Sequence, residues 1–147
     1  LQGPAQYNLC ISHRKRIQLN REANERERRE HPAVLVRAAP NARAQDMWVW
    51  PGLRLLGCAG HRRIRNGVIY EVEAVGDDFL TVGEGRPTFP QAIASLRLAY
   101  AQTYASCQGT EFSGSLALWD TTNRHFSRRH LFVALSRAKN AADLHVN

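Results

Sequence analysis

Short apolar runs separated by polar segments dominate the first two thirds of the chain. Each run has the length that is typical of a strand, and most of them are rich in β-branched or aromatic residues. The runs lie at residues 7–12, 33–38, 47–50, 53–57, 67–75 and 78–82. The pattern therefore predicts a chain that is rich in short strands.

Two segments instead have the composition and spacing of helices. Residues 13–30 are rich in helix formers and follow Ser12, a good N-cap residue. Residues 127–139, which read SRRHLFVALSRAK, carry Leu131, Phe132 and Leu135 at a spacing suited to one helical face. We expect a helix in each segment, the first mostly polar and the second packed on a core.

The middle third reads as an antiparallel unit. Residues 68–75 alternate between apolar and polar side chains, and the Asn66-Gly67 pair just before them favours a hairpin turn. We expect residues 47–86 to form a small antiparallel β-barrel, inserted into a second domain made of residues 1–46 and 87–147. The segment GEGRPTFPQ at its end reads as a loop.

The final third alternates strands and helices. SLRLAYA, SGSLALWD and DLHV read as strands, TYASCQG as a short helix or turn, and residues 127–139 as the helix noted above. This alternation implies parallel strands joined by crossover connections. The predicted fold class is α/β.

Charge indicates the kind of partner. The 147 residues include 20 Lys and Arg against 13 Asp and Glu, a net charge of +7. Such a balance favours polyanions, above all nucleic acid, although a solvated basic surface gives the same count. Arg14, Lys15 and Arg16 crowd the first turn of the first predicted helix, where positive charge opposes the helix dipole. We interpret these side chains as serving a partner such as a phosphate backbone.

The cysteines and the hydropathy indicate the cellular compartment and whether a metal site is expected. Cys10, Cys58 and Cys107 form no Cys-x-x-Cys pair, which argues for free thiols in a reducing compartment. Two Cys-x-x-His spacings occur, but Cys10 reads as a buried strand residue and His61 as part of a basic loop, so we predict no metal site. Without a signal peptide or a run long enough to span a bilayer, we expect an intracellular protein.

Candidate chemistry lies in the stretch AQTYASCQGTEF, residues 101–112. It places Thr103, Ser106 and Gly109 after a predicted strand, where open α/β sheets bind ligands. Hydroxyl groups and a closely approaching glycine backbone suit phosphates, but an ordinary strand-to-helix turn has the same composition. Alone, this stretch does not decide the function.

The order of three segments does. AQTYASCQGTEF resembles motif V of superfamily 1 helicases, and LFVALSRAK at residues 131–139 closely resembles their motif VI. LCISHRKRIQLNREAN at residues 9–24, which includes Asn20, is similar to their motif IV strand and helix. The β-rich segment at residues 47–86 looks like the SH3-like 2B insertion of the RecD and Pif1 branch. The resemblance covers nearly the whole chain in the right order.

This resemblance implies a RecA-like 2A domain with a 2B insertion, the second motor half of an ATP-dependent DNA helicase. The chain has no phosphate-binding loop and no acidic magnesium motif, so ATP and Mg²⁺ would be held only together with a first RecA-like half. The fragment alone should be inactive. By resemblance, Arg137 would be the catalytic arginine finger on the γ-phosphate, and the other nucleotide-binding residues would be Gln108, Gly109 and Glu111.

Single-stranded nucleic acid, DNA by preference, is the second implied partner. The residues expected to line its path are Ser12, His13, Arg14, Arg16, Thr103, Tyr104 and Ser106. Base stacking on Tyr104 or Trp48 is a further option, while packing in the barrel is the simpler reading of Trp48 and Trp50.

Departures from the family pattern leave alternatives open. Ala105 and Ser106 stand where the family usually has His-Lys, and Cys107 where it has Ser. One alternative is an RNA helicase of the viral superfamily 1 type, whose motifs V and VI read much the same. The other is a nucleic-acid-binding module that has lost catalysis.

Overall fold

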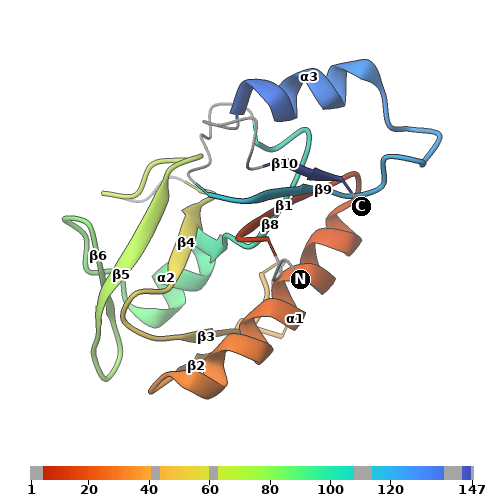
Figure 1. Cartoon of the computed structure of the whole chain (residues 1–147). Coiled ribbons are helices and arrows are strands. Elements are labelled where there is room, and N and C mark those ends of the chain that lie inside the picture. The colour runs from red at the N-terminus through yellow and green to blue at the C-terminus, as the bar shows by residue number, and fades with distance from the viewer. Residues whose placement is uncertain (1–4, 41–43, 60–62, 108–113, 138–143, 147) are drawn as a thin grey trace. The chain divides into compact units, whose positions relative to one another are not determined.

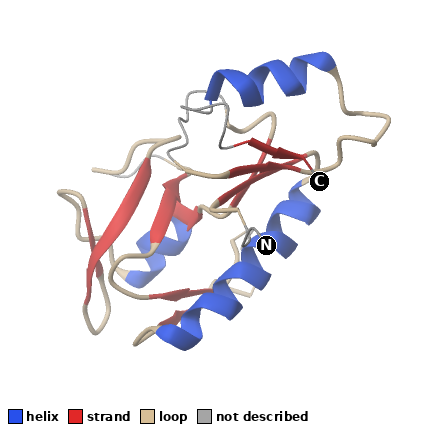
Figure 2. Ribbon diagram, in the orientation of Figure 1, coloured by secondary structure: helices blue, strands red, loops and turns tan. Residues whose placement is uncertain are grey.

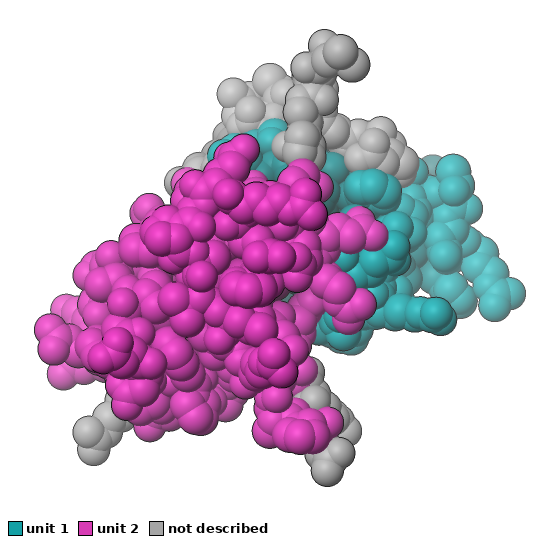
Figure 3. Space-filling view, turned by 90° about the horizontal axis from the view of Figure 1, so that it is seen from below, with its two compact units in different colours: residues 1–20, 100–147 teal, residues 21–99 magenta. Residues whose placement is uncertain are grey.

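The chain forms two compact units in the computed structural model, which describes residues 5–40, 44–59, 63–107, 114–137 and 144–146 (Figure 3). Unit 1 consists of residues 1–20 and 100–147, and unit 2 of residues 21–99. These boundaries differ from the expected domain limits of 47–86 for the insertion, and the division into a 2A domain and a 2B insertion stays a prediction.

Unit 1 is built on a sheet of four parallel strands in the order β10-β9-β1-β8 (Figure 1). The strands are β1 (Tyr7–Cys10), β8 (Ala101–Thr103), β9 (Leu116–Leu118) and β10 (Leu144–Val146). Leu9, Leu116 and Leu118 are buried on this sheet. Parallel neighbours with helical crossovers define an α/β architecture, so the predicted fold class is confirmed.

Two helices flank the sheet of unit 1. Helix α1 (His13–Glu27) follows β1, and α3 (Arg128–Arg137) precedes β10. The expected packing of α3 on a core through Leu131, Phe132 and Leu135 is wrong, because all three side chains are exposed. In the view of Figure 1, α3 lies above the sheet and the first half of α1 below it. The predicted N-cap is confirmed, because the Ser12 hydroxyl accepts a hydrogen bond from the Lys15 N–H at 3.2 Å. Helix α1 continues past Asn20 into unit 2, and a short 3₁₀ helix, η1 (Arg28–Glu30), follows it.

Unit 2 holds the antiparallel strands, shown with the helices in Figure 2. Strands β2 (Val34–Val36) and β3 (Met47–Val49) pair with each other. A second sheet has the order β6-β5-β4-β7 and is formed by β4 (Arg54–Gly57), β5 (Ile69–Val75), β6 (Leu80–Val82) and β7 (Leu96–Leu98). Leu55, Leu80 and Val82 are fully buried in it. The antiparallel strands expected for the middle third are confirmed.

The predicted single strand SLRLAYA is wrong. Residues 96–98 pair antiparallel with β4 in unit 2, whereas residues 101–103 pair parallel with β1 in unit 1. Because Leu96, Leu98, Ala99 and Ala101 are all buried, periodicity gave no sign of the break at residues 99–100.

The predicted loop before this run is also partly wrong, because it contains the start of α2 (Phe89–Ser95). Thr88 caps the helix with a capping box: its N–H donates to Gln91 Oε1 at 3.0 Å, and its hydroxyl accepts from the Gln91 N–H at 3.4 Å. Pro90 lies in the first turn of this helix, where proline removes no hydrogen bond.

Candidate nucleic-acid interface at the carboxyl edge of the parallel sheet

The carboxyl ends of β1, β8 and β9 lie at one edge of the unit 1 sheet, because these strands are parallel. The chain leaves this edge at Ile11, Tyr104 and Trp119. The structure therefore brings the predicted motif IV and motif V segments together, with the residues that follow β9 beside them.

The start of α1 presents basic side chains at this edge. No acidic residue occupies its first turn. His13 and Arg14 are exposed, whereas Arg16 is only 8% exposed and its Nε donates to His13 Nδ1 at 3.1 Å. Arg14 is thus placed to meet a ligand as it stands, while the buried Arg16 bonds to His13 within the same turn.

The turn after β8 is closed by its own hydroxyl groups. Thr103 Oγ1 donates to Ser106 Oγ at 2.8 Å, and the Ser106 N–H donates to Thr103 Oγ1 at 3.1 Å. Thr103 is buried and Ser106 is half-buried. Cys107, also buried, donates its thiol to the Tyr104 carbonyl at 3.2 Å. These bonds fix the backbone where motif V begins and leave Ser106 as its more accessible hydroxyl.

Tyr104 is a core residue in this arrangement. Its side chain is 2% exposed, and its hydroxyl donates to the Trp119 carbonyl at 2.7 Å. Its ring packs against Phe126 and His130, at centroid distances of 5.4 and 5.2 Å. Burial, with the nearby Asp120 carboxylate second, raises the pKa of the Tyr104 hydroxyl. The ring has no free face on which a base could stack. Tyr104 therefore supports this edge of the sheet as a core residue.

Asp120 links the ends of β9 and β1. Its Oδ2 accepts the Ile11 N–H at 3.0 Å, and its φ of 61° lies in the left-handed region that a residue other than glycine rarely adopts. Such backbone conformations cluster at binding sites, where the surrounding structure holds them in place. The backbone of Asp120 thus determines the direction in which the chain leaves β9, and its side chain holds the turn between β1 and α1.

Cys10 lies beneath this turn and is fully buried. Its thiol donates to the carbonyl groups of Gln102 at 3.6 Å and Ser12 at 3.5 Å. Burial, followed by the Asp120 charge, raises the pKa of the Cys10 thiol to about 12. A thiol this hard to ionise is a packing group and not a nucleophile.

The residues predicted to bind nucleotide are only partly described. Gln108, Gly109 and Glu111 lie outside the described residues. Arg137 is the last residue of α3. This helix belongs to unit 1, as do β1, β8 and β9. Over the described residues, no group of three or more His, Cys, Asp or Glu side chains could hold a metal ion.

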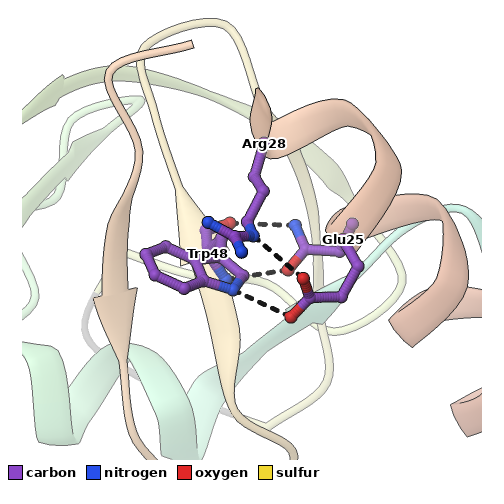
Figure 4. Close-up of polar contacts among 4 residues, drawn as sticks. Glu25, Arg28 and Trp48 are labelled. Carbon is purple, nitrogen blue, oxygen red and sulfur yellow. Dashed lines mark hydrogen bonds and ion pairs between the residues drawn. The ribbon is translucent and has the colours of Figure 1, made fainter. Parts of the chain in front are cut away.

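Trp48 and Trp50, both in unit 2, are occupied by protein contacts. The Arg28 guanidinium lies 4.1 Å from the centre of the Trp48 ring, and the Trp48 indole N–H donates to Glu25 Oε1 at 3.0 Å (Figure 4). Trp50 is 3% exposed and stacks on His31, with centroids 4.7 Å apart. Structural packing of both tryptophans is confirmed.

Sequence reasoning missed Trp119 and Asp120. Both follow β9 directly, at the same edge of the sheet as the motif IV and motif V turns. Their position was predictable, because the segment SGSLALWD was interpreted as a parallel strand whose last two residues must emerge at the ligand-binding edge. What the sequence did not indicate is the left-handed backbone of Asp120.

Comparisons with known proteins agree with this architecture. Residues 75–145 match the family described as viral superfamily 1 RNA helicase core domain. No curated protein matches the chain. In the part of the chain that the structure describes, no helix is long and apolar enough to cross a membrane.

Several solved structures share the fold. A Bacteroides Pif1 bound to ssDNA has a TM-score of 0.63 at 17% identity, covering 95% of this chain and 40% of that one. Pif1 helicase from Candida albicans has a TM-score of 0.60 at 16% identity, covering 99% and 46%. A Bacteroides sp. Pif1 in complex with ADP-AlF4 has a TM-score of 0.54 at 16% identity, covering 97% and 40%. The chain thus spans less than half the length of these proteins.

Proposed function

Because residues 75–145 match the family described as viral superfamily 1 RNA helicase core domain and the chain has the fold of Pif1 helicases, we propose that it is the C-terminal motor half of an ATP-dependent DNA helicase. The observation that carries this proposal is the arrangement of unit 1. Two segments that resemble motifs IV and V leave the same edge of one parallel sheet, and α3, which resembles motif VI, follows in the same unit.

The catalytic contribution of this half would be Arg137. Arginine keeps its charge at every accessible pH, and its planar fork matches phosphate oxygens in two directions at once. At the end of α3 it would reach across to a γ-phosphate held by another RecA-like half, with Gln108, Gly109 and Glu111 as further nucleotide contacts. The Pif1 relative that binds ADP-AlF4 supports nucleotide binding as the role of this fold.

ATP and Mg²⁺ would be held chiefly by the missing half. This chain has no glycine-rich phosphate loop, and among its proposed nucleotide contacts Arg137 and the Gly109 backbone suit phosphate oxygens. When bound, the nucleotide supplies the energy of phosphoryl transfer. The residues of this chain would bind and orient the nucleotide. Closure of the two RecA-like halves would move them along the single-stranded nucleic acid.

Single-stranded nucleic acid would pass along the carboxyl edge of the unit 1 sheet. The exposed residues Ser12, His13 and Arg14 would contact its backbone, together with the half-buried Ser106. The buried residues Arg16, Thr103 and Tyr104 would support these contacts from beneath. Contacts to phosphates are insensitive to base sequence, as a translocating motor requires. The intracellular setting expected from the cysteines belongs to the same proposal.

RNA is the second candidate substrate. It is favoured by the description of the matching family as an RNA helicase core, whereas the Bacteroides relative is described as bound to ssDNA. A module without catalysis is the remaining alternative, since the motif V segment lacks the usual His-Lys pair. Binding to oligonucleotides of matched length in DNA and RNA form distinguishes the two substrates.

ATP turnover tests the half-motor proposal. The chain alone should hydrolyse no ATP, with or without single-stranded DNA, because nothing in it holds the triphosphate in place. The intact protein that contains it should hydrolyse ATP faster when single strands are present. Turnover by the isolated chain above that of a heat-inactivated control would contradict the proposal, and an inactive intact protein that binds strands would support the module without catalysis.

A further inference from the structure

Trp119 is held rigidly at the carboxyl edge of the unit 1 sheet. Its N–H donates to the Leu9 carbonyl at 2.8 Å, and its own carbonyl accepts the Tyr104 hydroxyl at 2.7 Å. The indole Nε1 donates to Asn8 Oδ1 at 2.9 Å. Backbone and side chain are thus both fixed, yet the residue is not fully buried. Its large aromatic surface is therefore already ordered before any ligand arrives.

A cation lies over this ring. Lys15 Nζ is 4.8 Å from the centre of the Trp119 ring, and Lys15 belongs to the same first turn of α1 as Arg14. Among the described residues Lys15 forms no ion pair within 4.0 Å. The ammonium group is thus held near the ring by a cation–π contact, which is weak at a site open to water.

Trp48 provides an internal comparison in unit 2. Its ring also has a cation over it, but Arg28 is paired with Glu25 at 2.9 Å, and the Trp48 indole N–H donates to the same carboxylate. The cation, the ring and the acid form a closed set in which every group has its partner (Figure 4). At Trp119 the ring N–H donates instead to the neutral side-chain amide of Asn8. The charge of Lys15 is therefore not neutralised by a carboxylate in an ion pair among the described residues, and it is available to a phosphate.

We propose that Trp119 and Lys15 form a base-stacking site for single-stranded nucleic acid, in which a base stacks on the Trp119 ring and the Lys15 ammonium turns to the adjacent phosphate. The proposal rests on the strand path of the proposed function and adds to it an aromatic platform at that edge, since the Trp119 side chain is only partly buried.

The chemistry of single strands requires these two groups together. Every base has an apolar face that stacks on an aromatic ring regardless of sequence, and every nucleotide carries one phosphate for a cation. A lysine on four flexible methylene groups can leave the ring face and remain close to it. Because the indole is fixed by its Nε1 bond to Asn8, and the Trp119 backbone by its bond to Leu9, stacking costs little ordering of the protein.

Oligonucleotides with and without bases test this site directly in the unmodified 147-residue chain. We compare oligothymidylate with an oligomer of the same length made of abasic nucleotides, which has the same phosphate charge. Stacking at one site predicts that the abasic oligomer binds between about fivefold and about a hundredfold more weakly. It also predicts quenching of tryptophan fluorescence by oligothymidylate only. Equal affinity for the two oligomers would overturn the stacking site while the phosphate path stands.

Two variants locate the site. Trp119→Leu should remove both the preference for bases and the quenching, and it should keep the binding that depends on phosphate. Trp48→Leu should keep the preference, because the cation over that ring is held there by its ion pair with Glu25. Should Trp119→Leu melt at a lower temperature than the parent chain, Trp119→Phe, which keeps a stacking ring, should retain part of the preference. A full preference in folded Trp119→Leu would overturn the assignment.

The outcome also separates this site from the proposed function. If neither oligomer binds at low salt, the strand path itself is wrong and the stacking site is overturned with it. If both bind with a steep dependence on salt but without a preference for bases, only the stacking site is overturned, and the pair of Trp119 and Lys15 serves to hold α1 on the sheet.

Discussion

Asn20 binds both backbone groups of Ala101. Its Nδ2 donates to the Ala101 carbonyl at 3.1 Å, and its Oδ1 accepts the Ala101 N–H at 2.9 Å. Asn20 is fully buried in α1, and Ala101 begins β8, the outermost described strand of the sheet. The amide thereby takes the place of a neighbouring strand, satisfies an exposed sheet edge and fixes the strand that leads into motif V.

Replacement of Asn20 should therefore destabilise unit 1. Asn20→Ala leaves a buried N–H and a buried carbonyl without partners, and we expect a loss of about 2 to 4 kcal/mol in the free energy of unfolding. Chemical denaturation followed by circular dichroism measures this loss. Arg21→Ala, an exposed neighbour on the same helix, should change the stability by less than about 0.5 kcal/mol.

The same device occurs one turn later on α1. Asn24 Nδ2 donates to the Trp48 carbonyl at 2.9 Å, and Asn24 Oδ1 accepts the Trp48 N–H at 2.8 Å, so this asparagine serves a strand of unit 2. Asn24→Ala should cost a similar amount. If both variants unfolded at the same denaturant concentration as the parent chain, the bonds of these two side-chain amides to the strands would not stabilise the fold.

The contribution of Arg14 to nucleic-acid binding should appear in the salt dependence. Arg14→Gln removes one exposed cation from the start of α1, so the slope of the logarithm of affinity against the logarithm of salt concentration should fall by about 1. Titration of a fluorescent single strand at several salt concentrations measures the slope. Arg37→Gln, an exposed arginine of unit 2, is the control and should leave it unchanged; equal effects of both changes would mean that binding follows net charge alone.

Cys10 should make stability depend on alkaline pH. The pKa of its thiol is raised to about 12 in the folded chain from an ordinary value of 9.0, so the folded state holds a proton that the unfolded state releases above pH 9. The stability that this group contributes is complete below pH 9 and is lost as the pH rises toward 12, by on the order of 1 kcal/mol per pH unit.

Comparison with Cys10→Ala isolates this contribution. The variant lacks the buried methylene-thiol packing at every pH but has no thiol to ionise, so the difference in unfolding free energy between the parent chain and the variant should shrink from pH 8 to pH 10.5. A difference that stays constant over this range would show that the thiol ionises as easily in the folded chain as in the unfolded one.

Gly57 should tolerate no side chain. It ends β4, and a Cβ atom there would run into the carbonyl oxygen of Arg65, a backbone atom that cannot turn away. Gly57→Ala should cost about 1 to 3 kcal/mol through the forced shift of that backbone. A methyl group at Gly85 would meet nothing nearer than 3.4 Å, so the melting temperature of Gly85→Ala should stay much closer to that of the parent chain.

Much of this architecture was predictable from the sequence. The apolar runs of six or fewer residues became strands, the Ser12 cap began α1, and the resemblance of residues 101–112 and 131–139 to helicase motifs is confirmed by the family match over residues 75–145. These features are local, since each is decided by residues that are neighbours in the chain.

The features that were missed depend on contacts between distant segments. The sequence pattern gave no sign that residues 96–98 and 101–103 pair in different sheets, because the buried residues continue across both parts. The role of Asn20 depends on a strand 81 residues away. The burial of Tyr104 is decided by Phe126 and His130, which no pattern around motif V reveals. Which residues remain free to touch a strand is therefore a property of the folded unit.

The most direct test of the account is the ATP turnover of the intact protein with Arg137→Lys. Lysine keeps the charge but loses the planar fork, so turnover should fall by about a thousandfold while the affinity for single strands barely changes. Arg128→Lys and Arg129→Lys, exposed on the same helix, should lose far less. Equal losses in all three variants, or a loss at Arg137 that matches a fall in melting temperature, would contradict the assignment of this chain as the half that supplies the arginine finger.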